Sequence, residues 1–322
     1  MNPETFRFWH RFTGSMASAL GFLANTLLIY VIYKSTHPVK RIFCLMIFVD
    51  MTFLIVMAAT EPIIILVNGN EFLLQNGMFR HLPQPFNGFM ITVFVFGLYF
   101  SICSICVQFI FRYLILWKEI TVSNFVLALF LLVPMLAASA VGYLYHIGFS
   151  YDETDMKFAT DILKDILLET NETTVYLSGL SRRGNPLLLA LASAGFSCIT
   201  INYVIIALCI IKIQKRLRTL LPLLPHDHRQ MQKQISLTLL ILAASPLFIS
   251  IIPLAYLCYC AMTGGTAFWS MILLTMGFSW VPFTNAILTM SIVKDFRPSQ
   301  TFLKIKGSSN TVGTGPTPNY IM

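Results

Sequence analysis

The sequence predicts an all-α membrane protein in which seven helices form one transmembrane bundle. Only 11% of the 322 residues are charged and 56% are hydrophobic, whereas soluble domains carry about a quarter charged residues. Seven stretches without Lys or Arg are each long enough to cross a bilayer, which takes roughly 17 to 25 residues. Because backbone polar groups in lipid must be satisfied internally and these runs far exceed a barrel strand, we expect helices.

The expected spans are apolar around their whole circumference, unlike the single apolar stripe of a soluble core helix. They cover Phe12–Tyr33, Ile42–Leu66, Asn87–Phe111, Val122–Tyr145, Pro186–Ile211, Ile235–Cys258 and Thr266–Val293. We assign residues 1–306 to the seven-helix domain. Residues 307–322 are rich in Gly, Ser, Thr, Asn and Pro, and this composition predicts a disordered cytoplasmic tail.

The basic residues lie outside the expected spans and indicate which end of the bundle faces the cytoplasm. Fifteen of the 22 Lys and Arg residues fall in the connections and tail of one side, and seven on the side of the N-terminus. An excess of Lys and Arg marks the cytoplasmic side, so we expect the N-terminus outside and the C-terminus inside. The net charge of +8 therefore indicates a surface for membrane lipids and cytosolic partners, not for nucleic acid. The sequon at Asn171 lies in the long outer loop, the side where glycosylation occurs.

Two carboxyl groups fall inside the expected spans, where ionisable groups are costly and often functional. Asp50 and Glu61 are eleven residues apart, about three helical turns, so we expect them on one face of the second span. Asn25 in the first span is expected to hydrogen-bond to Asp50. For Asn25 and Asp50, a conformational switch and a purely structural tie are equally good interpretations. Glu61 either contacts a ligand or is wetted at the outer interface.

Cysteine and histidine patterns give little indication of metal or redox chemistry. Cys103 and Cys106 have the spacing of a redox or zinc pair, but they lie in the middle of an expected span without a second pair. We interpret them as packing residues. His226 and His228 stand alone in a loop, whereas metal sites usually need three or four ligands. Since no phosphate loop or nucleophile–base arrangement is evident either, we expect no metal, no cofactor and no enzymatic activity.

The layout of seven spans, an outer N-terminus and a basic third inner loop resembles that of G-protein-coupled receptors. The third span ends in Gln108-Phe109-Ile110-Phe111-Arg112-Tyr113, which resembles the inner-end arginine signature of that superfamily, with Phe111 in place of the usual acidic residue. This aromatic-Arg-Tyr variant is similar to the nematode serpentine chemoreceptors of the Str superfamily, with its Str, Srd and Srj groups.

Three further segments resemble that family. They are Asn25–Tyr30 in the first span, Met231–Gln234 before the sixth, and Pro282–Asn285 with Ile292–Arg297 at the end of the seventh. Two features of the wider receptor class are missing: the cysteines that tie the third span to the second outer loop, and the Asn-Pro-x-x-Tyr motif. The chain therefore resembles the nematode branch more than the main rhodopsin-like group.

The resemblance implies a chemosensory receptor that binds a small odorant or pheromone on its outer side and activates a heterotrimeric G protein inside. It also implies a location in the plasma membrane, at the sensory cilium of a chemosensory neuron. The coupling surface is expected at Arg112, Tyr113, Lys215, Arg216 and Arg218, although a basic surface suits anionic lipid equally well.

A ligand pocket is expected among the outer halves of the third, fifth, sixth and seventh spans. Its expected residues are Glu61, Tyr99, Phe100, Tyr256, Trp269 and Phe278. Aromatic side chains in membrane helices also serve as packing residues or interface anchors. The alternative functions are a transporter or channel for a small solute, which usually shows repeated halves or broken helices, and a purely structural membrane protein.

Overall fold

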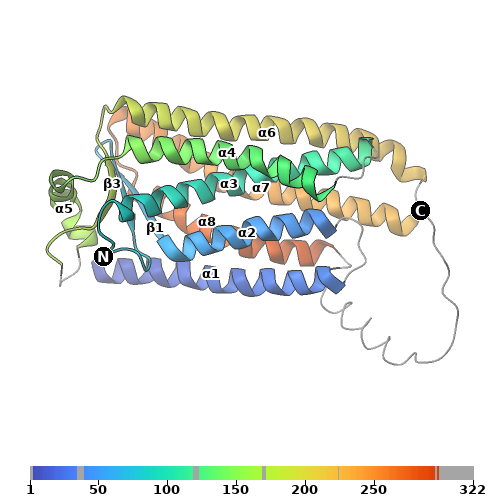
Figure 1. The fold of residues 1–322 in the computed structure, drawn as a ribbon, viewed down its shortest axis with the longest axis horizontal. Helices are drawn as coiled ribbons and strands as arrows, with labels where there is room; N and C mark the ends of the chain where they lie inside the picture. Colours follow the sequence, from blue (N-terminus) through green and yellow to red (C-terminus); the bar gives the residue numbers. More distant parts are fainter. Residues whose placement is uncertain are drawn as a thin grey trace, which may run out of the picture.

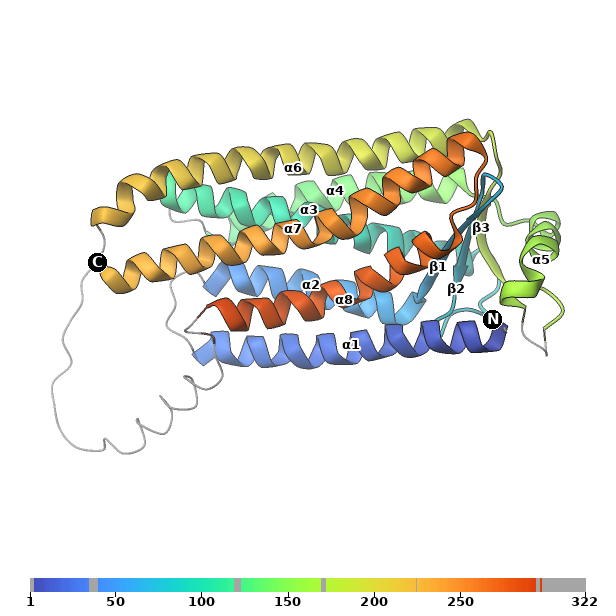
Figure 2. The same ribbon diagram turned by 180° about the vertical axis from the view of Figure 1, so that it is seen from behind.

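The computed structural model of the chain describes residues 3–34, 40–118, 123–168, 172–223, 225–293 and 296. Within these residues, seven long helices lie side by side along the longest axis of the molecule (Figures 1 and 2). They are α1 (Pro3–Lys34), α2 (Lys40–Thr60), α3 (Phe86–Lys118), α4 (Asn124–Gly148), α6 (Pro186–Leu220), α7 (His226–Thr263) and α8 (Phe268–Ile292).

The length and composition of these helices fit a membrane bundle. In the described residues, α1, α2, α3, α4, α6 and α8 are long and apolar enough to cross a membrane. α7 contains 38 residues and lies in the same bundle (Figure 2). The predicted all-α fold of seven helices is therefore confirmed, whereas the direction in which it faces stays a prediction. The tail predicted for residues 307–322 and the sequon at Asn171 lie outside the described residues.

Several helix ends follow local signals in the sequence. Pro186 occupies the first position of α6, and the Asn185 side chain accepts a hydrogen bond from the backbone N–H of Leu187. Both features are typical of helix starts. Gly264 ends α7 with a φ of 74°, the left-handed conformation that terminates many helices and that glycine adopts without strain.

One end of the bundle is covered by a small sheet and a short helix, which together we call the cap. β1 (Pro62–Val67) and β2 (Asn70–Gln75) form an antiparallel hairpin, and β3 (Leu177–Ser181) pairs antiparallel with β2. The strand order is therefore β1-β2-β3. Helix α5 (Glu153–Leu167) lies beyond the sheet at the same end (Figure 1).

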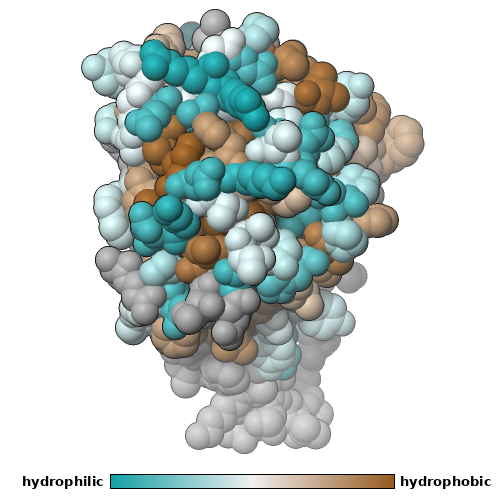
Figure 3. Space-filling view, turned by 90° about the vertical axis from the view of Figure 1, so that its left-hand side faces the viewer, coloured by the Kyte–Doolittle hydropathy of each residue, from teal (hydrophilic) through white to brown (hydrophobic). Residues whose placement is uncertain are grey.

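The sheet separates two apolar clusters because successive side chains of a strand point to opposite faces. Leu66 and Leu73 pack with the nearby half of the bundle. Phe72 and Leu74 pack with residues of α5 such as Leu163. The sheet thus lies between the helical bundle and α5. Figure 3 looks onto this end, where hydrophilic side chains cover much of the face and apolar patches lie between them.

The second span is shorter than predicted because the chain leaves the helix at Glu61. α2 ends at Thr60, and Glu61 has a φ of 39°, which is uncommon for a residue other than glycine. Proline disfavours a helical conformation in the residue before it, and Pro62 is followed by Ile63–Ile65, a β-branched run that suits a strand. The expectation that Asp50 and Glu61 share a helical face is therefore wrong.

The first helix is longer than predicted because its polar first turns contact the cap. It begins at Pro3 and not at Phe12. The Nε of Arg7 donates to the carbonyl of Leu167 (2.7 Å), and the Nε of Arg11 donates to the carbonyl of Asn76 (3.0 Å). These bonds join α1 to two segments of the cap end.

Gly77 is expected to be essential for the junction between the cap and α2. A Cβ at this position would lie 2.4 Å from the carbonyl oxygen of Ala59, and the Gly77 N–H donates to the carbonyl of Thr60 (3.1 Å). Gly77→Ala therefore forces backbone to move and should destabilise the protein by about 1–3 kcal/mol, as overpacking does. Thermal unfolding of the purified protein in detergent measures the effect.

Gly14→Ala is the matched control for this substitution. Its added Cβ would meet only ordinary contacts, 3.7 Å from the side chain of Glu61. We expect the Gly14→Ala protein to unfold near the wild-type temperature. Equal unfolding temperatures for the Gly77→Ala protein and the wild type would contradict the proposed close junction.

Candidate functional site

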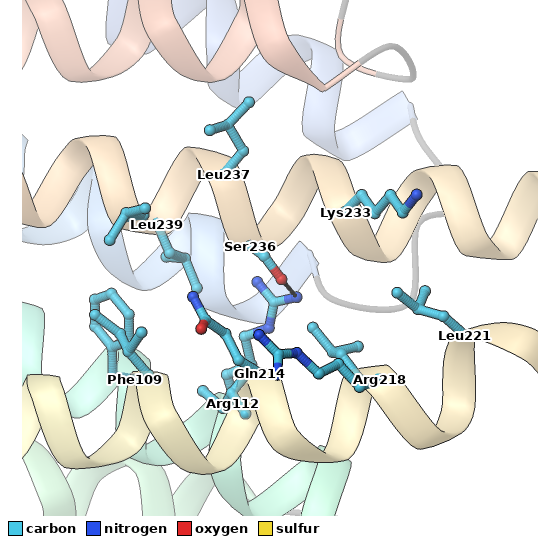
Figure 4. A pocket seen from close by; sticks show the side chains of 13 residues that line it. Phe109, Arg112, Gln214, Arg218, Leu221, Lys233, Ser236, Leu237 and Leu239 are labelled. Carbon is cyan, nitrogen blue, oxygen red and sulfur yellow. Dashed lines mark hydrogen bonds between the residues drawn. The ribbon is translucent and has the colours of Figure 1, made fainter.

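The end of the bundle opposite the cap, which we call the basic end, contains a cleft of about 440 Å³ between α3, α6 and α7 (Figure 4). Helices α6 and α7 extend beyond the predicted limits at Ile211 and Ile235. Residues expected in a loop therefore lie on helices and line the cleft. The polar lining residues are Arg112, Gln214, Arg218, Lys233 and Ser236.

Arg112 lies buried in this cleft, with 3% of its surface exposed. Its Nη2 donates to the Oγ of Ser236 (2.6 Å) and to the carbonyl of Gln232 (2.9 Å), and Figure 4 shows the bond to Ser236. Its Nη1 has no hydrogen-bond partner in the described part of the chain. Because a hydrogen bond to a charged group contributes roughly 1.5–3 kcal/mol, Arg112 ties α3 to α7 in this arrangement.

The other residues predicted for coupling lie around the cleft at different depths. Arg218 lines it, whereas the Nε of Arg216 donates to a backbone carbonyl of α3 (3.3 Å). Tyr113 is half-buried, and Lys215 is exposed and outside the cleft lining. The structure thus brings Arg112 and Arg218 together and leaves Lys215 on the outer surface.

A second cavity, of about 60 Å³, lies under the sheet at the cap end. One water needs roughly 10–15 Å³ of such space, so the cavity has room for about four to six non-hydrogen atoms. Helices α3, α4, α6, α7 and α8 contribute to its wall, together with β1 and β2. The helical part of the wall is apolar and aromatic and includes Phe94, Tyr99, Tyr145, Ile199, Leu257 and Phe278.

The residues predicted for the ligand pocket separate into three groups. Tyr99 and Phe278 line the cap-end cavity, and Phe100 is buried in the same apolar cluster without lining it. Tyr256 and Trp269 are 45% and 58% exposed. Glu61 lines a separate cavity of about 10 Å³ beside α1 and α8, room for roughly one water, and its Oε1 accepts a hydrogen bond from Ser15.

Sequence reasoning missed Glu71, the acidic residue in the wall of the cap-end cavity. Glu71 is 2% exposed and lies on β2 two residues before Leu73, on the strand face that packs against the bundle. In the part of the chain that the structure describes, its side chain has no hydrogen-bond or ion-pair partner. Burial raises the pKa of Glu71 to about 7. Residues 71–75 read Glu-Phe-Leu-Leu-Gln, which lacks the alternation of polar and apolar residues that would have assigned Glu71 to a strand face.

The middle of the bundle holds a buried polar contact between α2 and α8. Asp50 accepts from the Nδ2 of Asn285 at 3.2 and 3.3 Å. Asn25 instead donates to the carbonyls of Gly21 (2.9 Å) and Pro282 (3.2 Å). The predicted bond between Asn25 and Asp50 is therefore wrong, because the backbone of α8 engages Asn25 and an amide one turn further along engages Asp50.

Cys103 and Cys106 lie on the same side of α3, three residues apart, but they form no disulfide. Both side chains are buried, and the Sγ of Cys103 lies at hydrogen-bond distance, 3.5 Å, from that of Cys198 on α6. The Nδ2 of Asn202 donates to the Sγ of Cys103 (3.2 Å). Cys103 thus belongs to a contact between α3 and α6. The side chains of His226 and His228 lie outside the described residues.

Comparison with known proteins gives a family match and a likeness to solved structures. The model of the family described as "Serpentine type 7TM GPCR chemoreceptor Str" matches residues 10–299. Among solved structures, the crystal structure of squid rhodopsin is similar, with a TM-score of 0.61 and 13% sequence identity, over 94% of this chain and 87% of that chain. At this identity the likeness shows a common fold. No curated protein matches.

Proposed function

Because the chain belongs to the Str family of serpentine seven-transmembrane G-protein-coupled chemoreceptors, we propose that it binds a small chemical ligand at its cap end and activates a heterotrimeric G protein at its basic end. One observation carries this proposal. The cap-end cavity and the cleft around Arg112 lie at opposite ends of the same three helices, α3, α6 and α7. A relative movement of these helices changes both sites.

The ligand acts by binding one arrangement of the three helices better than the other. Moving an equilibrium from 1:99 to 99:1 takes about 5.5 kcal/mol of differential binding. Very small ligands gain at most about 1.5 kcal/mol per non-hydrogen atom. Four to six atoms therefore supply enough energy in principle, provided that most contacts are made in only one arrangement.

The release of Arg112 is the step that we propose at the basic end. In the present arrangement its Nη2 is bonded to Ser236 and to the backbone of Gln232. Displacing α7 from α3 breaks both bonds and leaves the guanidinium exposed to the cleft. A fixed cation with several donors then faces the partner, with Arg218 and Lys233 in the same lining. The exposed Lys215 contacts anionic lipid in this proposal.

The decisive experiment measures ligand-dependent G-protein activation in heterologous cells that express the full chain at the surface. A panel of small volatile compounds should contain at least one that activates the G protein in a concentration-dependent manner. Solute accumulation without G-protein activation would instead favour the transporter alternative and would overturn the receptor mechanism.

The orientation of the bundle is part of the same proposal, with the cap outside and the basic end in the cytoplasm of a plasma-membrane receptor. We expect glycosidase treatment to increase the gel mobility of the wild type and to leave that of the Asn171→Gln protein unchanged. The reason is that only a sequon on the outer side receives a glycan. Antibody staining of an N-terminal tag on unpermeabilised cells is the control, and staining only after permeabilisation would contradict the orientation.

A further inference from the structure

The cap-end cavity contains one carboxyl group whose charge no described residue offsets. We propose that Glu71 recognises a small basic amine, whose ammonium group meets the Glu71 carboxylate while its apolar part fills the cavity beside Tyr99 and Phe278. This inference rests on the proposed function, because it names the ligand class of the same cavity.

The position of Glu71 is fixed by the sheet. β2 is the central strand, and Glu71 pairs with Leu66 on β1 and with Ser181 on β3. Both neighbours restrain the backbone, and the alternation along β2 directs Glu71 toward the same side as Leu73, into the bundle. The carboxyl group therefore faces the cavity and cannot turn to the outer face of the sheet without unpairing the strand.

Three arginines of the cap end have partners other than Glu71. Arg7 donates to the carbonyl of Leu167, Arg80 forms an ion pair with Glu172, and Arg182 forms one with Asp155. A buried carboxylate without a counter-charge costs several kcal/mol. Burial raises the pKa of Glu71 to about 7 for this reason, so an empty cavity holds a carboxyl that is only partly ionised at neutral pH.

An arriving cation removes this cost and gains a charge-assisted hydrogen bond. Rings of Phe94, Tyr99, Tyr145 and Phe278 contribute to the cavity wall, and aromatic faces attract cations. A ligand with a carboxylate would be repelled by Glu71. An alcohol of the same size can donate one hydrogen bond, but it brings no charge to offset that of the carboxylate.

The volume of the cavity limits the number of atoms in the ligand. Room for about four to six non-hydrogen atoms fits a monoamine with three to five carbons. Butylamine, 1-butanol and butanoate have similar lengths and differ in charge, so they separate the contribution of charge from that of size.

Binding to the purified full-length protein in detergent tests the inference without any G protein. We expect butylamine to raise the thermal unfolding temperature of the wild type and to bind more tightly than 1-butanol, with butanoate the weakest. Glu71→Gln keeps the shape of the side chain and removes its charge. This variant should bind butylamine at least tenfold more weakly and bind 1-butanol as the wild type does.

Glu153→Gln, which removes an exposed carboxylate of α5, is the matched control and should keep the wild-type affinity. Butylamine affinities within twofold for wild type and Glu71→Gln would overturn the inference, as would tighter binding of butanoate than of butylamine. Activation of a G protein by neutral ligands alone would also overturn it while leaving the proposed function intact. Charge-dependent amine binding without any G-protein activation in cells would support it and overturn the proposed function.

Discussion

Replacing Arg112 with alanine is expected to abolish ligand-stimulated G-protein activation, and replacing Ser236 with alanine is expected to raise activity without ligand. Both effects follow from the bonds that Arg112 makes to α7. Ser236→Ala removes one acceptor of a charged donor, worth roughly 1.5–3 kcal/mol, which changes the ratio of the two arrangements by about 10- to 150-fold. Arg112→Ala also loosens α7 but removes the cation that the partner needs. Nucleotide exchange on the G protein, at equal receptor amounts, measures both.

Lys215→Ala is the control for the loss of one positive charge, because Lys215 is exposed and does not line the cleft. Its dose response should equal that of the wild type. A wild-type response from the Arg112→Ala receptor would rule out the coupling role of Arg112. Unchanged basal activity in the Ser236→Ala receptor would show that the bond to α7 does not hold the resting arrangement.

The sequence predicts the helices well because a membrane helix is recognisable as a long apolar run. It does not predict the cap, for a physical reason visible in Pro62–Val67. This strand is apolar on both faces, since one side packs on the bundle and the other on α5. A short apolar run of this kind cannot be told from the end of a helix by periodicity. For this reason most of this strand falls within the predicted second span.

For the candidate site as well, the sequence identifies residues that belong to a motif but not the residues that contact them. The arginine signature identifies Arg112, but its partner Ser236 is an ordinary residue of a helix and becomes visible only when α3 and α7 are placed together. An aromatic residue type also does not indicate whether the residue lies on the helix face that lines the cavity. Leu257 lines the cap-end cavity while its neighbour Tyr256 is exposed, because adjacent helical residues point about 100° apart.

Removing the amide of Asn285 is expected to destabilise the receptor and to weaken its response to ligand. Asn285 supplies the hydrogen bonds that Asp50 accepts, and both side chains are buried. Asn285→Leu leaves a buried carboxyl without its donor, which costs roughly 1–3 kcal/mol and more if the group is charged. Thermal unfolding in detergent measures the loss. Thr289→Val, one turn further along α8 at a fully buried position, removes a hydrogen bond to the backbone carbonyl of Asn285 (2.8 Å) but leaves the donor of Asp50 in place. It is therefore the control for the loss of one buried hydrogen bond on α8.

Exchanging the two side chains separates a specific pair from two independent polar residues. The double variant Asp50→Asn with Asn285→Asp keeps one amide and one carboxyl in contact, so it should recover most of the unfolding temperature that Asn285→Leu loses. If the pair is also a switch, Asp50→Asn alone should change the dose response, because the two helix arrangements then differ in how they hold the carboxyl. An unchanged dose response together with a lower unfolding temperature assigns Asp50 to structure. An exchanged pair that is no more stable than Asn285→Leu would mean that the surroundings of each position, and not their mutual contact, select the native residues.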